Sequence, residues 1–213
     1  MIEYLKKHPE KIFVPFFEHV QIVLITLAFS IVIAAVLTLL ALKYRRLQNA
    51  LGQFLAILYS IPSLAFFALL IPVTGLGRTT AIIVLTVYNQ YLLVRNFLTG
   101  LQEVDPAAVE AAKGIGMTWM QVVRIVQLPL AKPAIIAGIR LAVVSTVGIA
   151  TIAASINAGG LGSLLFDGLR TMNMAKIMWG SLLSAGLAII LNAGLSKVGI
   201  RFRKMNDSNN PSR

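Results

Sequence analysis

Long hydrophobic runs, separated by short polar segments, dominate this chain. Residues 20–42 carry no charge, and at 1.5 Å per residue a helix of that length reaches about 34 Å, enough to cross the hydrocarbon core of a bilayer. Four further runs are predicted to be spans: residues 51–71, 79–94, 133–154 and 177–196. The pattern therefore predicts an all-α polytopic membrane protein with about five transmembrane helices.

Composition supports a membrane protein and excludes several chemistries. Hydrophobic residues make up 57% of the chain and charged residues only 13%, which lies outside the range of a soluble domain of this length. The chain has no cysteine, so neither disulfides nor thiolate metal ligands are available. Its two histidines, His8 and His19, are too far apart to form a ligand pair. No metal site and no catalytic site are predicted.

Basic residues flank the spans and predict the topology. The cluster at residues 43–46 and the basic C-terminal residues mark one side as cytoplasmic, which puts the N-terminus outside and the C-terminus inside. Residues 1–19 are predicted to lie along the interface, residues 20–198 to form the transmembrane domain, and residues 199–213 to form a cytoplasmic polar tail whose last residues are disordered. The Gly-rich segment 155–176 has an apolar part too short to span and is predicted to be external or re-entrant.

Polar residues and prolines inside the spans are candidates for the interior of the bundle. Pro62 removes a helical hydrogen bond and is expected to kink the second span, where a kink suits a gate. An amide pair, Asn89 and Gln90, is costly to expose to lipid, so it faces another helix or an aqueous path, and interhelical hydrogen bonding is favoured. The full candidate set for a translocation path or gate is Pro62, Ser63, Asn89, Gln90, Ser145 and Asn157.

The positions of the acids bear on the energy source. All eight carboxylates lie outside the predicted spans. Carriers that couple transport to protons or sodium usually hold the coupling ion with a carboxylate near the midplane, so a secondary transporter is disfavoured. The chain also lacks a Walker motif, which excludes ATP hydrolysis by this polypeptide and a phosphate-binding role for the Gly-rich segment. The driving force must therefore come from a partner.

Residues 105–129 form a charged insert between apolar runs and are predicted to fold as two short helices. Asp105 is placed to cap the first helix, and Gly116 follows its end. Thr118 is placed to cap the second helix, which is expected to end just before Pro129 because a residue before proline disfavours helical geometry. Two general interpretations are a DNA-binding helix-turn-helix and an amphipathic hairpin on the membrane surface. The first is disfavoured, since the second helix offers few polar side chains to reach base edges.

The spacing within this insert supplies a third interpretation. Glu-Ala-Ala at residues 110–112 is followed after three residues by Gly116, and Leu-Pro closes the pattern at residues 128–129. This resembles the EAA loop of binding-protein-dependent, type I ATP-binding-cassette (ABC) importer permeases, with Val126 where isoleucine is usual. The resemblance implies that the loop is a cytoplasmic coupling element seated on an ATPase subunit. The implied ATPase-coupling residues are Glu110, Ala111, Ala112, Gly116, Leu128 and Pro129.

Two further stretches narrow the resemblance. LYSIPSLAFFALLIPVTGLG and INAGGLGSLLFDGLR are similar to segments of osmoprotectant permeases, which carry glycine betaine, carnitine or choline. Methionine permeases share a Gly-Gly-Leu-Gly stretch, so a methionine or other amino-acid permease is the alternative. The resemblance implies a non-enzymatic subunit of the bacterial cytoplasmic membrane without a cofactor of its own. ATP and Mg²⁺ are expected on a partner ATPase, together with a second permease subunit, a separate extracytoplasmic substrate-binding protein, surrounding lipid and no nucleic acid.

Overall fold

The computed structural model describes residues 2–208 of the chain, and the side chains of residues 3–200. Within residues 2–208 the regular elements are all helical, which confirms the predicted fold class. In chain order they are α1 (Ile2–Lys7), α2 (Glu10–Lys43), α3 (Arg45–Ser60), α4 (Ser63–Thr74), α5 (Arg78–Gln102), α6 (Pro106–Gly114), α7 (Trp119–Gln121), a π-helix (Val122–Gln127), α8 (Leu128–Ile152), a 3₁₀-helix (Ala153–Ile156), α9 (Leu161–Arg170) and α10 (Met174–Ser208).

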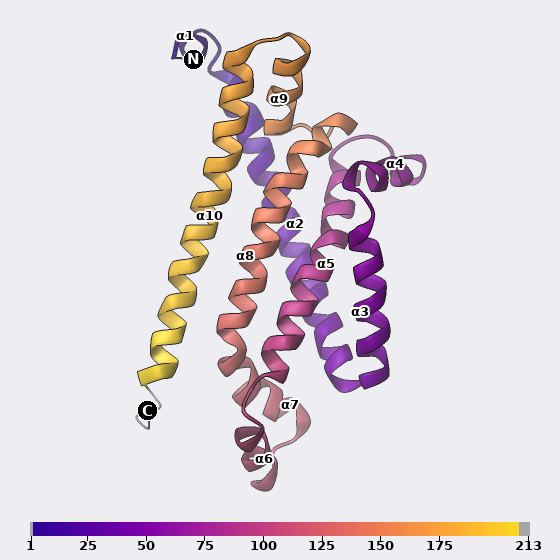
Figure 1. Ribbon diagram of the computed structural model, residues 1–213, viewed down its shortest axis with the longest axis vertical. Coiled ribbons are helices and arrows are strands. Elements are labelled where there is room, and N and C mark those ends of the chain that lie inside the picture. Colours follow the sequence, from indigo (N-terminus) through magenta and orange to yellow (C-terminus); the bar gives the residue numbers. More distant parts are fainter. Residues whose placement is uncertain (1, 209–213) are drawn as a thin grey trace.

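Four long helices, α2, α5, α8 and α10, run along the length of the molecule, and α3 lies beside α5 (Figure 1). Helices α6 and α7 project at one end of the molecule, which we call the loop end. Helices α4 and α9 lie toward the opposite end, which also holds the N-terminus. Among the described residues four helices are long and apolar enough to cross a membrane, and a fifth span results if α3 and α4 are counted together. The predicted number of spans is therefore confirmed.

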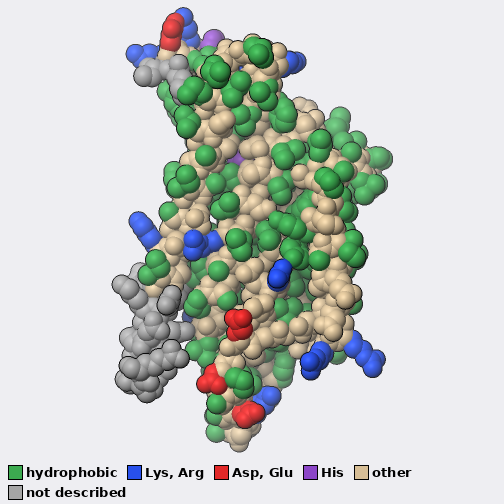
Figure 2. All heavy atoms as spheres, viewed as in Figure 1, with side chains coloured by type: hydrophobic (Ala, Val, Ile, Leu, Met, Phe, Trp, Pro, Cys, Tyr) green, Lys and Arg blue, Asp and Glu red, His purple; other side chains and the backbone are tan. Residues whose placement is uncertain are grey.

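The main core lies where α2, α5 and α8 meet. Ile22, Val23, Leu85, Leu93 and Val147 are almost fully buried there. The outer surface carries many large apolar side chains, visible over most of the face in Figure 2, as expected for helices that face lipid. On this face the acidic side chains lie at the top and in the lower part, whereas several basic side chains lie near mid-height.

The first long helix begins earlier than the sequence suggested. It was expected at residue 20, but α2 begins at Glu10 and includes Pro15. Pro15 is the sixth residue of α2, just beyond the first four positions whose N–H groups have no partner within the helix, so it removes one helical hydrogen bond, to the Lys11 carbonyl. Ile12 and His19 are buried, so this part of α2 packs against the rest of the chain. The division of the chain into residues 1–19, 20–198 and 199–213 stays a prediction.

The second span is broken rather than kinked. Helices α3 and α4 meet at an angle of 97°, and the break falls at Pro62 as predicted. Ile61 and Pro62 both have extended backbone, with ψ values of 129° and 133°. The hydroxyl of Tyr88 donates a hydrogen bond to the Ile61 carbonyl, which the break leaves without a helical partner. Pro72, the residue directly after the predicted span 51–71, lies inside α4, so the helix extends past the predicted end.

The prediction that a helix ends before Pro129 is wrong. Helix α7 continues through the π-helix into α8, and Pro129 occupies the first turn of α8. In the π-helix the Leu128 N–H bonds to the Val123 carbonyl, five residues earlier, so the turn is one residue wider than an α-helical turn. The wider turn changes the position of the carbonyls that a proline ring would otherwise meet. The insert is thus joined rigidly to the long helix after it.

The last part of the chain follows the predicted plan with a longer final helix. Helix α9 has ten residues, too few to span, as expected for segment 155–176. Lys176 and Arg170 donate hydrogen bonds to the Asp167 carboxylate and hold its pKa below the ordinary value, which fixes the turn between α9 and α10. Helix α10 reaches Ser208, beyond the expected start of the polar tail, and residues 209–213 of that tail lie outside the described residues.

Candidate functional site

The insert at the loop end has the capped two-helix structure that its sequence predicts. The Asp105 carboxylate accepts a hydrogen bond from the Ala107 N–H at 2.9 Å, at the start of α6. The Thr118 hydroxyl accepts from the Gln121 N–H, and the Gln121 side chain accepts from the Thr118 N–H at 2.8 Å. These are the two halves of a capping box. The caps fix both helix starts without tertiary contacts, so the insert can keep its shape while it projects from the bundle.

Gly116 forms the elbow between the two helices. Its φ of +85° lies in the left-handed region that only glycine adopts freely. Of the Glu-Ala-Ala residues, Ala112 is buried against the loop, whereas Glu110 and Ala111 are exposed. Leu128 and Pro129 lie apart from this tip, in the first turn of α8. The six predicted coupling residues therefore divide into a tip, Glu110 to Gly116, and a base, Leu128 and Pro129.

Exposed apolar side chains lie at the tip of the insert and on the neighbouring helix α7. Ile115 is 76% exposed, Met120 52% and Trp119 39%. Figure 2 shows acidic side chains around this end of the molecule, and Glu110 lies on the adjoining surface of α6. An apolar patch rimmed by charges marks a protein-binding surface. The tip therefore has the chemistry of a docking site for another protein.

The base of the insert is tied to two long helices. The Gln127 side chain donates to the Leu101 carbonyl at 3.0 Å, which links the π-helix to α5. Helices α5 and α8 also approach closely, because a Cβ at Gly100 would lie 2.5 Å from the Ala134 Cβ. Val122 and Val123 are buried at the same place. A displacement of the insert must therefore move α5 and α8 together.

A buried polar cluster joins three helices near the middle of the bundle. The Asn89 amide donates to the Thr146 hydroxyl at 2.8 Å and to the Ser30 hydroxyl at 3.2 Å, which connects α5 to α8 and α2. Gln90 donates to the Thr86 and Ser30 carbonyls. Both amides are buried, so they make the interhelical hydrogen bonds that the sequence favoured. The sequence did not identify Ser30 as a partner, since a single serine in an apolar run carries no signal of its own.

The remaining candidates for a path or gate are scattered. Pro62 and Ser63 lie at the corner between α3 and α4, Ser145 is half-buried on α8, and Asn157 is exposed at the end opposite the insert. The structure brings only Asn89 and Gln90 together, as neighbours in α5. For all six residues a role in transport stays a prediction.

The end opposite the insert contains a contact that the sequence did not reveal. The Glu18 carboxylate accepts a hydrogen bond from the Gly160 N–H at 3.0 Å and lies 3.5 Å from the Arg78 guanidinium. Gly159 and Gly160 both have positive φ, and a Cβ at Gly159 would lie 2.6 Å from the Glu18 carboxylate. The Gly-rich segment thus allows close approach to α2. The Gly160 N–H thus bonds to an anion that belongs to the chain itself.

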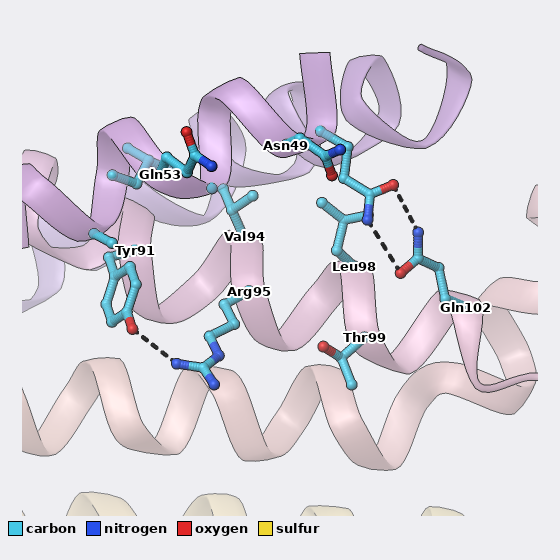
Figure 3. A pocket seen from close by; sticks show the side chains of 12 residues that line it. Asn49, Gln53, Tyr91, Val94, Arg95, Leu98, Thr99 and Gln102 are labelled. Carbon is cyan, nitrogen blue, oxygen red and sulfur yellow. Dashed lines mark hydrogen bonds between the residues drawn. The ribbon is translucent and has the colours of Figure 1, made fainter. Parts of the chain in front are cut away.

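A cavity of about 490 Å³ lies between α3 and α5, toward the loop end (Figure 3). Asn49 and Gln53 approach it from α3, and Tyr91, Arg95 and Thr99 approach it from α5. At one end the Gln48 and Gln102 amides hydrogen-bond to each other in both directions. The cavity therefore combines groups that can bind a polar solute with apolar side chains such as Leu55, Val94 and Leu98.

The fold and the capped two-helix insert are those of a membrane-embedded subunit of the type I ABC importer class. A family model described as binding-protein-dependent transport system inner membrane component matches residues 28–196, and the chain belongs to that family. Among curated relatives, the choline transport system permease protein OpuBB of Bacillus subtilis is 33% identical over 90% of this chain and 88% of its own length. The glycine betaine/carnitine/choline permease OpuCB of the same organism is 37% identical, covering 82% and 81%.

Another relative and two solved structures are similar to this chain as well. The osmoprotectant import permease protein OsmW of Salmonella typhimurium is 36% identical over 83% of this chain and 84% of its own length. A chain of the inward-facing MetNI methionine ABC transporter superposes with a TM-score of 0.84 at 22% identity, covering 90% of this chain and 95% of that one. An amino acid ABC transporter crystallised with histidines gives a TM-score of 0.75 at 15% identity, covering 96% and 98%. At these identities the structures show the shared fold.

Proposed function

We propose that this chain is the transmembrane permease subunit of an ATP-driven importer for osmoprotectants such as glycine betaine, carnitine or choline. The observation that carries the proposal is the insert, whose capped helices hold an exposed apolar tip beside Glu110 on a base tied to α5 and α8. The substrate class is supported by the names of relatives that are 33–37% identical over most of the chain.

A methionine or other amino-acid permease is the second candidate. The likeness to the methionine transporter favours it, but at 22% identity that likeness concerns the fold. The substrate names of the more similar sequences favour osmoprotectants. The residues that we assign to ATPase coupling are the same under either substrate: Glu110, Ala111, Ala112, Gly116, Leu128 and Pro129.

The proposed assembly contains partners at both ends. ATPase subunits, which would hold ATP and Mg²⁺, dock on the insert at the cytoplasmic side, and a substrate-binding protein meets the opposite, external end. A second permease subunit completes the path, because the main core of this chain is filled by α2, α5 and α8. In the bacterial cytoplasmic membrane this arrangement puts the N-terminus outside and the C-terminus inside.

The proposed mechanism is alternating access driven by the insert. Nucleotide-dependent closure of the ATPases moves the tip, and the bond between Gln127 and the Leu101 carbonyl transmits this motion to α5 and α8. The Asn89 amide then carries it to α2 through Ser30. Pro62, Ser63, Ser145 and Asn157 remain proposed elements of the path or gate, of which Pro62 is best placed for a hinge because the chain bends by 97° there.

Reconstitution tests the proposal. The chain is combined with its proposed ATPase and substrate-binding protein partners, in liposomes loaded with ATP and Mg²⁺. We expect ATP-dependent uptake of radiolabelled glycine betaine, carnitine or choline that excess methionine does not suppress. Uptake of methionine instead would establish the second candidate. Concentrative uptake by this chain without the ATPase would contradict the proposed mechanism.

Cysteine labelling tests the topology, and the absence of native cysteine gives a clean background. Ile115→Cys places a thiol at the tip of the insert, where the side chain is 76% exposed. Met172→Cys is the matched variant at the opposite end, where the side chain is 87% exposed. A membrane-impermeant maleimide added to intact cells lacking an outer-membrane barrier should label Met172→Cys alone. Labelling of Ile115→Cys under these conditions would reverse the proposed orientation.

A further inference from the structure

The cavity between α3 and α5 contains one charged side chain, that of Arg95. Its guanidinium donates to the Tyr91 hydroxyl at 2.7 Å and lies 5.8 Å from the centre of the Tyr91 ring. Arg95 forms no ion pair with any other residue whose side chain the structure describes. The positive charge is thus held in place by a neutral group and is not compensated by any side chain that the structure describes.

The position of Arg95 makes this lack of a partner informative. It lies seven residues before the end of α5, about 10 Å along the helix axis at 1.5 Å per residue. An ionised group within a span is costly unless it meets water, an anion or a headgroup. An exposed arginine at this depth therefore faces either an aqueous path or the lipid interface.

The lining of the cavity favours a small polar solute over a lipid. Asn49 and Gln53 on α3 and Thr99 on α5 supply further hydrogen-bonding groups in the lining of this cavity, with Val94 and Leu98 between Arg95 and the two α3 amides (Figure 3). A volume of about 490 Å³ is within the range of small-molecule sites. A second cavity of about 400 Å³, near Phe97 and Leu128, has an almost entirely apolar lining. An acyl chain would enter the second cavity in preference to the first.

We propose that the cavity at Arg95 is a substrate site on the inner half of the translocation path, where the guanidinium binds the carboxylate of a zwitterionic substrate. This inference rests on the osmoprotectant function proposed above, and it predicts that Arg95 distinguishes between the three proposed substrates. Glycine betaine and carnitine carry a carboxylate, whereas choline carries a hydroxyl and a net positive charge. Arg95 therefore attracts the first two and repels choline.

The test compares substrates within each variant, so that the contribution of an unchanged binding protein cancels. Initial uptake rates of glycine betaine, carnitine and choline are measured in proteoliposomes for wild type, Arg95→Gln, Arg95→Glu and the conservative Arg95→Lys. We expect Arg95→Gln to lower glycine betaine and carnitine uptake about tenfold relative to choline, the value of one charge-assisted hydrogen bond. Arg95→Glu should enlarge that difference, and Arg95→Lys should largely restore the wild-type ratios.

A binding measurement covers the case in which the complex imports only one of the three compounds. Saturation-transfer NMR on the purified permease–ATPase complex, without binding protein, uses glycine betaine and choline as probes. The signal from glycine betaine should exceed that from choline in wild type, and Arg95→Gln should remove the difference. Lys197→Gln is the control, since it removes an exposed basic charge on α10 outside the cavity.

Three outcomes would overturn the inference. If Arg95→Gln changes all three uptake rates equally, Arg95 does not bind a substrate carboxylate. If the wild-type rates fall when anionic lipid is omitted and the Arg95→Gln rates do not, the counter-ion is a lipid phosphate. If wild type imports and binds none of the three compounds, the proposed function fails and this inference fails with it.

Discussion

Gly116→Val is expected to abolish ATP-driven uptake while the protein still inserts and folds. A β-branched residue at a φ of +85° is strained by about 1–2 kcal/mol. No atom lies within 4 Å of the position that a Cβ would occupy, so the loop can relieve the strain by changing its backbone. That change turns α6 relative to α7 and separates Glu110 from the exposed side chains of Trp119 and Met120. The docking surface is then lost although the transmembrane core is untouched.

Gly114→Val supplies the matched control. Gly114 is the last residue of α6 and also has open space around it, but its φ is not positive. The same side chain two residues away should therefore leave uptake close to wild type. Both variants are assayed for uptake and for co-purification with the ATPase. Equal uptake by the two variants, with the ATPase bound in both, would show that the left-handed elbow has no part in coupling.

The parts of the fold that depend on local sequence were predicted well. Four of the five predicted spans are uncharged runs, and residues 133–154 contain one charge, Arg140. Such runs mark spans because each charge placed in lipid costs free energy. The caps at Asp105 and Thr118 were also predictable, since the groups that bond there are two or three residues apart. The Glu-Ala-Ala spacing located the insert, which is a contiguous segment.

The parts that depend on distant contacts were not predictable. Pro62 fixed the place of the break, but the 97° angle also depends on the packing of Phe66 and Phe67 and on the Tyr88 hydroxyl, which lies on another helix. The continuous helix through Pro129 depends on a π-helix, which has no sequence signature of its own. The contact between Glu18 and Gly160 joins residues 142 positions apart.

The cavity at Arg95 is a candidate site that also depends on distant contacts and could not be predicted from the sequence. The sequence placed Arg95 at the end of a span, where a long side chain can reach the interface. It did not show that Gln53 on α3 would lie across a cavity from it, since α3 and α5 are separated by the broken segment at Pro62. The charge was therefore visible in the sequence, whereas the lack of an acidic partner among residues 3–200 became visible only in the structure.

Gly162→Ala is expected to reduce the yield of folded protein more than any other single-methyl change. A Cβ at Gly162 would lie 1.9 Å from the Thr151 carbonyl oxygen and 2.8 Å from the Ala154 Cβ. The nearest obstacle is helix backbone, so no rotamer change can relieve the clash, and α9 must move away from the end of α8. Overpacking of this kind costs about 1–3 kcal/mol or more. The displacement would also pull the Gly160 N–H away from Glu18.

The measurement is the melting temperature and the monodisperse yield in detergent, followed by size-exclusion chromatography. Gly148→Ala is the control. Gly148 lies on α8, the helix that carries Thr151, is exposed, and has no atom within 4 Å of the position that a Cβ would occupy. Alanine there should hold or raise stability, since it is the better helix former by about 1 kcal/mol. If Gly162→Ala has the same melting temperature as wild type, then α9 does not pack on the Thr151 backbone as closely as described. The contact between Glu18 and the Gly160 N–H would then be in doubt as well.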